Sequence, residues 1–473
     1  MSNEDLCYQS VAELSKQIAS QTLSPVELTR AYLDRTEQLD PTVSVVITLT
    51  REHALAQAAQ AEREVRDGRI RGPLHGIPYS VKDLFDTKDI RTTGGSYIYR
   101  ERIPDRDATA IERLTDAGAV LVAKLAMSEF ASGGNNNNLI SHPRNPWKLD
   151  RSPQGSSSGS GVATAAGMAA FTLGSETGGS IMAPSGANGV CGMRPTYGRV
   201  SRFGVMALAW SLDKAGPMTR TAEDLGLVLE AIAGHDPKDR TSRPTSAFRF
   251  RRDPGPGGRR RIGVVRAEFD LVPEANRTVF ARALDVLAQA GFILEDVDLP
   301  DRPYSAVYTL ISNTEAGTNF KPLFDDERIG LLYTAERRAD WMAASMMPAS
   351  DYLKALRIRA MIKREADDVT SRFYTLVAPT SPTGSGLINP PRDTPPAAPG
   401  ASDLSNRNVR RLNTIGNLCG LPGISIPCGF DAEGMPLGLH IAARSWDDQA
   451  TLDVGMIFQK ETDFHLHRPS LRS

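Results

Sequence analysis

The stretch from Ser152 to Ser185 constrains the fold more than any other part of the chain. It reads SPQGSSSGSGVATAAGMAAFTLGSETGGSIMAPS, with glycine and small hydroxyl residues at both ends and an alanine-rich, apolar middle from Val162 to Leu173. Glycine costs backbone entropy and is used mainly where a chain takes unusual dihedral angles or approaches a ligand closely. The pattern predicts two serine-rich loops joined by one buried helix. We interpret the loops as the centre of an active site whose base lies elsewhere in the chain.

Composition excludes several classes of partner. The 473 residues hold 55 Lys and Arg against 56 Asp and Glu, a net charge of −1, so no overall field favours nucleic acid or an anionic membrane. The amino terminus lacks a signal pattern and no apolar run is long enough to span a bilayer, which predicts a cytoplasmic protein. The histidines and cysteines lack metal-ligand spacing and no phosphate-binding loop is present, so neither a metal nor a cofactor is expected.

Strand and helix patterns alternate along the whole chain. This order predicts an α/β fold with a largely buried sheet. No internal repeat or clean linker is visible, so we expect one domain over residues 1–473, with the N-terminal helices of about residues 1–70 packed on its core. Examples of the expected strands are 77–81, 120–123, 262–265, 375–378 and 423–428, and examples of the expected helices are 25–39, 51–66, 273–290 and 447–461.

Lys82 closes the short apolar run Ile77–Val81 and is a candidate buried amine. A lysine at such a place more often extends its amine to solvent. However, a serine nucleophile needs a base, and burial lowers the pKa of a lysine toward the value that a base requires. A G-x-S-x-G motif is centred on Ser157, but it follows a polar segment where a nucleophile elbow needs an apolar strand. A serine–lysine mechanism is therefore favoured over a hydrolase triad with histidine.

Five motifs together resemble the amidase signature family over nearly the whole chain. They are GIPYSVKD at 76–83, GSSSGSGVATAAG at 155–167, GSETGGSI at 174–181, GMRPTYGRVSRFGV at 192–205 and NLCGLPGISIPCGF at 417–430. The resemblance implies a large mixed central β-sheet covered by helices on both faces. It also implies a serine hydrolase that works without a cofactor.

The resemblance assigns roles to individual residues of this chain. It implies Lys82 as the base, Ser156, after a cis peptide bond, as the proton relay and Ser180 as the nucleophile. The oxyanion hole would be formed by backbone N–H groups of Thr177, Gly178, Gly179 and Ser180. We expect variable loops at 133–139, 207–210 and about 312–347 to shape the pocket. The expected substrate-binding residues are Gly133, Gly134, Asn135, Met182 and Trp210.

The chain departs from the family pattern at three positions. Glu176 stands where aspartate is usual, and Met182 replaces the arginine that normally pairs with that carboxylate. An unpaired buried carboxylate is costly, so we expect Glu176 to find another cation, with Lys82 and Arg194 as candidates. Arg410 stands where the glutaminase branch of the family has an aspartate, which speaks against glutamine as the substrate.

These features lead to one expected function and several alternatives. The expected reaction is hydrolysis of the C–N bond of neutral amides, with aryl amides or carbamates (urethanes) as plausible substrates, through a serine acyl-enzyme in the free-standing amidase branch. The alternatives are the glutaminase subunit of a tRNA-dependent amidotransferase, an esterase-leaning member and a scaffold without activity. The expected partner is a small-molecule substrate, with neither nucleic acid nor a membrane, and a homodimer is left open.

Overall fold

A central mixed β-sheet runs through the molecule. The structure is a computed structural model that describes residues 3–132, 137, 139–255, 260–388 and 410–471. Within these residues, eleven strands form one sheet in the order β1-β3-β2-β4-β6-β5-β10-β11-β9-β7-β8. The strands are β1 Val46–Leu49, β2 Pro78–Lys82, β3 Val120–Leu125, β4 Phe171–Glu176, β5 Cys191–Arg194, β6 Lys214–Thr219, β7 Arg261–Val264, β8 Ile293–Asp296, β9 Thr375–Pro379, β10 Gly423–Phe430 and β11 Pro436–Ala442.

Parallel and antiparallel pairs both occur in this sheet. β2 pairs in parallel with both β3 and β4, and β7 does so with β8 and β9. The pairs from β4 through β6, β5, β10 and β11 to β9 are antiparallel. Most strands between β3 and β9 are buried along their whole length, as expected for a sheet covered by helices. The predicted α/β fold with a large mixed sheet is confirmed.

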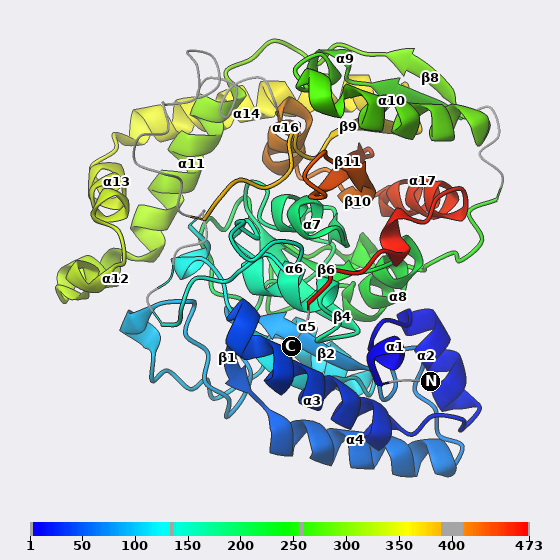
Figure 1. Ribbon diagram of the computed structural model, residues 1–473. Coiled ribbons are helices and arrows are strands. Elements are labelled where there is room, and N and C mark those ends of the chain that lie inside the picture. The colour runs from blue at the N-terminus through cyan, green and yellow to red at the C-terminus, as the bar shows by residue number, and fades with distance from the viewer. Residues whose placement is uncertain (1–2, 133–136, 138, 256–259, 389–409, 472–473) are drawn as a thin grey trace.

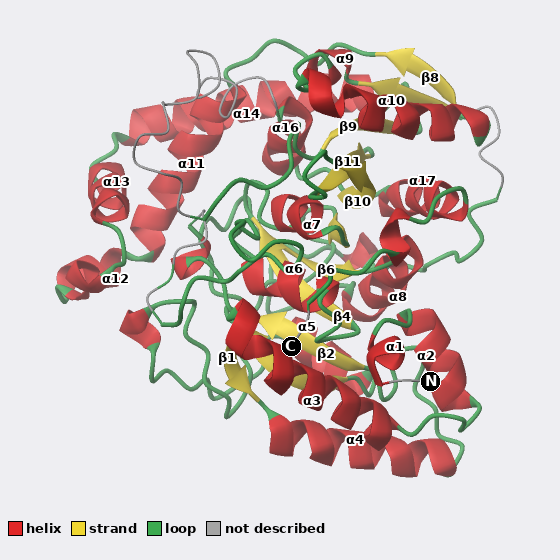
Figure 2. Ribbon diagram, viewed as in Figure 1, coloured by secondary structure: helices red, strands yellow, loops and turns green. Residues whose placement is uncertain are grey.

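Helices surround the sheet, as Figures 1 and 2 show. The first four lie together beside β1–β3: α1 Asn3–Cys7, α2 Val11–Ala19, α3 Pro25–Val43 and α4 Arg51–Arg66. Helix α6 Ser158–Ala165 packs on β2 and β4, α7 Met182–Asn188 packs on β5, β10 and β11, and α16 Arg411–Cys419 lies near β11. Further helices are α5 Thr109–Asp116, α8 Ala222–Ile232, α10 Glu274–Gln289 and α17 Asp448–Lys460.

Local sequence signals explain where several elements begin. Ser24 caps α3, because its hydroxyl accepts hydrogen bonds from the N–H groups of Val26 and Glu27, and Pro25 occupies the first turn. The predicted strand–helix–strand unit is present as β7, α10 and β8, with the two strands parallel. None of the helices in the described part of the chain is both long and apolar enough to cross a membrane.

The expected helix across residues 162–173 is wrong. Helix α6 ends at Ala165, and Gly167 follows with a φ of +67°, a left-handed conformation that suits glycine. The chain then enters β4 at Phe171, where it pairs with β2 and β6. The alanine-rich run therefore splits into a short helix and a buried strand. The prediction failed because a buried helix and a buried strand are both apolar in sequence.

The region expected to form a variable loop at about 312–347 is mostly helical. It contains most of α11 Tyr304–Asn319, followed by α12 Lys321–Asp325, α13 Ala335–Ser345 and the approach to α14 Ala349–Thr370. Phe320 and Trp341 stack with ring centroids 4.6 Å apart, and Phe320 also contacts Phe130 of the core. This helical layer, yellow-green to yellow in Figure 1, lies along one side of the molecule. Aromatic packing fixes it there.

Candidate active site

Lys82 is the last residue of β2 and is completely buried. Its Nζ donates hydrogen bonds to the hydroxyl oxygens of Ser156, at 2.7 Å, and Ser175, at 2.9 Å. Burial lowers the pKa of Lys82 to about 7, and the negative charges of Asp213 and Glu176 oppose this shift only in part. A substantial fraction of the amine is therefore neutral near neutral pH, as a general base requires.

Ser156 lies between the lysine and the second serine-rich loop. The peptide bond between Gly155 and Ser156 is cis, and the carbonyl of Ser156 accepts a hydrogen bond from the N–H of Ser128 at 3.1 Å. The side chain is buried, and its hydroxyl can pass a proton only along the polar contacts around it. The hydrogen bond to Lys82 gives it a base on one side.

Ser180 lies in the turn between β4 and α7 and is partly exposed, in contrast to Lys82 and Ser156. Its carbonyl accepts a hydrogen bond from the N–H of Ser157 at 3.2 Å, which joins the two serine-rich loops directly. Gly179, just before it, has a φ of +136°, a conformation that L side chains rarely adopt. The fold thus presents one reachable serine beside a buried serine–lysine pair.

The turn from Thr177 to Ser180 is held by contacts to its other groups. The hydroxyl of Thr177 donates to Asp213 at 2.6 Å, and the amide of Asn413 donates to the carbonyl of Gly178 at 3.0 Å. Within the described residues, no acceptor bonds the N–H groups of residues 177–180. These donors therefore remain available to a negatively charged oxygen, as an oxyanion hole requires.

Tyr308 packs directly against this turn from helix α11. A Cβ atom placed on Gly178 would lie 2.2 Å from the Tyr308 hydroxyl oxygen, so no side chain larger than hydrogen fits at position 178 unless the ring moves. Burial raises the pKa of Tyr308 to about 12, so the hydroxyl is neutral at physiological pH. Helix α11 therefore supplies a wall of the site, through a residue that lies just before the loop expected at about 312–347.

Glu176 ends β4 and is fully buried. Of the two expected cations, Arg194 forms the ion pair, with Nη1 2.9 Å from Oε1 of Glu176. Asn417 also donates to Oε1 at 2.9 Å, and the N–H groups of Ile181 and Met182 donate to Oε2 at 2.8 and 2.9 Å. Burial alone would raise the pKa of Glu176, but Arg194, Lys214 and the two N–H groups together lower it to about 2.

The other predicted binding residues lie in different surroundings. Met182 is 1% exposed, in an apolar cluster with Ala165, Ile181, Val190 and Met218. Trp210 is 39% exposed, and its carbonyl accepts a hydrogen bond from the hydroxyl of Tyr197 at 2.9 Å. Gly133, Gly134 and Asn135 lie outside the described residues.

Several charged residues near the site were missed by sequence reasoning. Lys214 lies opposite Glu176 in the β4–β6 ladder, and its Nζ donates to Asn417 at 2.7 Å. Lys124 forms a buried ion pair with Asp83, the residue after Lys82, with 3.2 Å between Nζ and Oδ1. Little in the sequence signals the position of Lys214, because β6 contains glycine and proline and reads as a loop.

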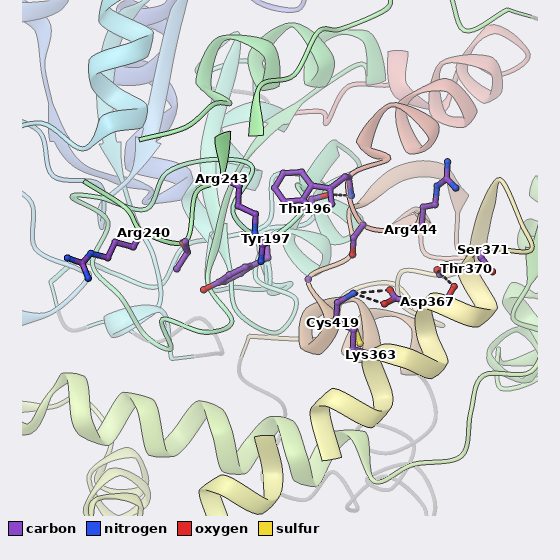
Figure 3. A pocket seen from close by; sticks show the side chains of 14 residues that line it. Thr196, Tyr197, Arg240, Arg243, Lys363, Asp367, Thr370, Ser371, Cys419 and Arg444 are labelled. Atoms are coloured by element: carbon purple, nitrogen blue, oxygen red, sulfur yellow. Dashed lines mark hydrogen bonds and ion pairs between the residues drawn. The ribbon is translucent and has the colours of Figure 1, made fainter. Parts of the chain in front are cut away.

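Two hollows lie near the carboxyl-terminal strands. The larger, of about 730 Å³, has Arg240 and Arg243 on one side and Arg444 on the other, with the Lys363–Asp367 pair between them and none of the expected catalytic residues in its wall (Figure 3). The smaller, of about 140 Å³, is lined by Gln154, Ala183 and Arg410 among others. Gln154 directly precedes the cis peptide bond, and Ala183 lies three residues after Ser180. The smaller hollow therefore adjoins the loops that carry Ser156 and Ser180.

The family comparison covers almost the whole chain. A family model described as "Amidase" matches residues 27–452. The chain is 37% identical to the A subunit of the glutamyl-tRNA(Gln) amidotransferase of Carboxydothermus hydrogenoformans, over 99% of this chain and 100% of that protein. It is also 37% identical to the protein of the same name from Moorella thermoacetica, over 99% of each chain.

Solved structures show the same fold. The A subunit of the glutamyl-tRNA(Gln) amidotransferase of Thermotoga maritima superposes with a TM-score of 0.81 at 28% identity and covers 99% of each chain. The native peptide amidase of Stenotrophomonas maltophilia superposes with a TM-score of 0.82 at 30% identity, over 96% of this chain and 97% of that one.

The full-length relatives also correct the expected function. The expectation of a free-standing hydrolase of neutral amides, aryl amides or carbamates is wrong, because these relatives, 37% identical over their whole length, are amidotransferase subunits. They support the alternative of a glutaminase subunit instead. With this correction, the chain belongs to the amidase signature family and is an amidase-type hydrolase of carbon–nitrogen bonds other than peptide bonds.

Proposed function

We propose that this chain is the amide-hydrolysing subunit of an amidotransferase and releases ammonia from a primary carboxamide through a serine acyl-enzyme. The observation that carries the proposal is the buried Lys82 amine, 2.7 Å from the Ser156 hydroxyl and beside the loop that presents Ser180. The full-length similarity to the A subunits of glutamyl-tRNA(Gln) amidotransferases supports the choice of assembly. Glutamine is therefore the first substrate to test.

The proposed reaction begins with the neutral amine of Lys82. It accepts the proton of the Ser156 hydroxyl while Ser156 accepts the proton of Ser180, and the Ser180 oxygen attacks the carbonyl carbon of the amide. The N–H groups of residues 177–180 stabilise the negative charge on the carbonyl oxygen. Ser156 then donates a proton to the leaving nitrogen, and ammonia departs. Water hydrolyses the ester on Ser180 by the same relay and releases the acid.

Covalent labelling tests the nucleophile. A fluorophosphonate should add once to the purified protein, and peptide mass spectrometry should place the adduct on Ser180. Ser180→Ala should abolish labelling, whereas Ser345→Ala, a change at an exposed serine in α13, should leave it intact. Labelling that persists in Ser180→Ala would remove Ser180 from the proposed mechanism.

Ammonia release tests the reaction. The wild-type chain should release ammonia and the matching carboxylic acid in equal amounts from a primary carboxamide, with glutamine tested first, and Ser180→Ala should release neither. If no primary carboxamide yields ammonia while the fluorophosphonate still labels Ser180, the protein is a serine hydrolase of another class and the amidotransferase proposal is wrong.

Co-purification tests the assembly. An affinity-tagged chain expressed in its own host should retain other amidotransferase subunits, identified by mass spectrometry, after a wash at moderate salt.

The predictions of one domain over residues 1–473, a cytoplasmic location and a homodimer as an open state stay predictions. The same holds for substrate binding by Gly133, Gly134, Asn135, Met182 and Trp210.

A further inference from the structure

Arg410 is a half-buried positive charge without an ionic partner in the described part of the chain. It immediately precedes α16, and its Nε and Nη2 atoms are buried and form no hydrogen bond. No carboxylate among the described residues forms an ion pair with it. Burying a charged group is costly unless that group is paired. The position therefore calls for an anion that the described residues do not supply.

The Arg410 guanidinium lies against the oxyanion turn. A Cβ atom placed on Gly179 would be 3.4 Å from Nη2 of Arg410, so the guanidinium touches the residue just before Ser180. Arg410 also lines the hollow of about 140 Å³ that adjoins the catalytic loops. A small molecule that places its carbonyl over Ser180 would therefore bring its next few atoms to Arg410.

The acidic groups around Arg410 do not neutralise it. Glu176 is engaged by Arg194 and Asn417. Glu268, in α9 Arg266–Phe269, accepts a hydrogen bond from the N–H of Leu412 at 2.7 Å. Burial raises the pKa of Glu268 to about 8 although Arg410 lies near it, so this carboxyl is mostly protonated at neutral pH. Among the described residues, no ionised carboxylate is therefore left to pair with Arg410, and its charge can serve a ligand.

The two unpaired nitrogens define the kind of anion. Nε and Nη2 form one edge of the planar guanidinium, and their N–H bonds point in parallel. This edge matches the two oxygens of a carboxylate, which it can bind through two charge-assisted hydrogen bonds. The guanidinium repels an ammonium group at the same place.

We propose that Arg410 forms a carboxylate subsite and that the substrate is a primary amide whose acyl chain carries a carboxylate a few carbons from the scissile carbonyl, without an ammonium beside that carboxylate. This inference rests on the proposed function, because it specifies the amide whose hydrolysis was proposed above. Glutaramate, which is glutamine without its amino group, fits this description. Glutamine itself carries the repelled ammonium on the carbon that bears its carboxylate.

Substrate kinetics test the subsite with an isosteric pair. Glutaramide has the shape of glutaramate but carries a neutral amide in place of the carboxylate. Wild-type kcat/KM should be roughly ten- to hundredfold higher for glutaramate than for glutaramide, and higher for glutaramate than for glutamine. Arg410→Gln should lower kcat/KM for glutaramate far more than for glutaramide, by raising the KM of glutaramate, and Arg410→Lys should restore part of the preference.

Arg411→Gln is the matched control. It removes the same charge from the neighbouring residue, whose guanidinium contacts the Pro300 carbonyl and Asp301. The preference for glutaramate should survive this change. Equal losses on glutaramate and glutaramide in Arg410→Gln would show that Arg410 only supports the loop and would overturn the proposal.

Binding measurements keep the subsite testable without turnover. In a calorimetric titration, glutarate should bind the Ser180→Ala protein. Its affinity should be roughly ten- to hundredfold higher for this protein than for the double variant Ser180→Ala, Arg410→Gln. Equal affinities for the two proteins would overturn the subsite even if amides are hydrolysed. Arg410-dependent binding without ammonia release from any amide would uphold the subsite and refute the proposed reaction.

Discussion

At the scale of single residues, the site depends on a lysine that the fold keeps from staying fully protonated. Lys82 has serine hydroxyls as hydrogen-bond partners, and its burial is complete. Arg194, not Lys82, forms the ion pair with Glu176 at the end of β4. Because Arg194 pairs with Glu176, this buried carboxylate can remain ionised while the nearby amine of Lys82 can act as a base.

The pH dependence of activity should report the Lys82 amine. Only its neutral form accepts a proton, so kcat/KM should rise as pH increases through an apparent pKa of about 7 and then level off. Lys82→Met should lower kcat/KM by about 10²–10⁴ and remove this limb from the pH profile. A limb that persists unchanged in Lys82→Met would assign it to another group.

The same lysine should affect stability. Its pKa is about 7 in the folded protein and about 10.4 in an unfolded chain, so the unfolded chain binds more protons between these values. Wild-type stability should therefore gain from this group as pH rises through that window. In chemical denaturation, the free energy of unfolding of Lys82→Met should exceed that of the wild type at neutral pH. This difference should shrink as pH increases. A constant difference at all pH values would contradict the assignment.

At the scale of elements, the turn of residues 177–180, which is the proposed oxyanion turn, is positioned by segments distant in the sequence. Helix α11 contributes Tyr308, α16 contributes Asn413, and the residue before β6 contributes Asp213. A strand, β4, delivers the turn from the centre of the sheet. The turn itself is short and rich in glycine, so these contacts set its shape.

Gly178→Ala should distort this turn. The added methyl group would lie 2.2 Å from the Tyr308 hydroxyl oxygen, and displacing an oxyanion donor lowers the rate by about 10²–10³. Combining Gly178→Ala with Tyr308→Ala should recover part of kcat, because the obstructing ring is removed. Gly330→Ala, at a glycine with open space around it, should leave kcat unchanged. No recovery in the double variant would show that Tyr308 is not the obstruction.

The Glu176–Arg194 pair should be stabilising only as a pair. Arg194→Met leaves a buried carboxylate without its cation and should lower the free energy of unfolding by about 3–5 kcal/mol. Adding Glu176→Gln should recover a large part of that loss in urea denaturation. Arg249→Met, at an arginine that is 95% exposed, should change stability by less than about 1 kcal/mol. Additive losses in the double variant would mean that the two side chains do not interact.

At the scale of the whole molecule, the site draws on elements from both halves of the chain. Lys82 and Arg194 come from β2 and β5 in the first half, whereas Arg410 and Asn413 come from the segment around α16 in the second half. The sheet order places β4 and β6 between β2 and β5. Unfolding of either β2 or the segment around α16 would therefore remove part of the site.

Activity should be lost in the first unfolding transition in urea. The helical layer touches the oxyanion turn through Tyr308, and the sheet carries the remaining groups, so opening either one should disrupt the site. Ammonia release and circular dichroism measured on the same urea series would test this. Activity that survives a first cooperative loss of ellipticity would identify a part of the fold on which the site does not depend.

Local patterns predicted the elements whose signals are short-range. The cap at Ser24, the β7–α10–β8 unit and the strand ending at Lys82 all follow from neighbouring residues. The structure of the run from Val162 to Leu173 could not be predicted in this way, because apolar sequence cannot distinguish a buried strand from a buried helix. Pairing with β2 and β6 makes the second half of this run a strand. The helices of residues 304–345 escaped because their stability depends on packing such as the Phe320–Trp341 stack.

The sequence by itself determined the family, the two serine-rich loops and a candidate lysine at the end of an apolar strand. Only the tertiary structure decided what surrounds those groups. Arg194 replaces the missing cation beside Glu176, and Arg410 lies against the catalytic turn with no ion pair to any described residue. The physical reason is that a motif specifies neighbours along the chain, whereas the charge and shape of a pocket are set by side chains brought together across the sheet.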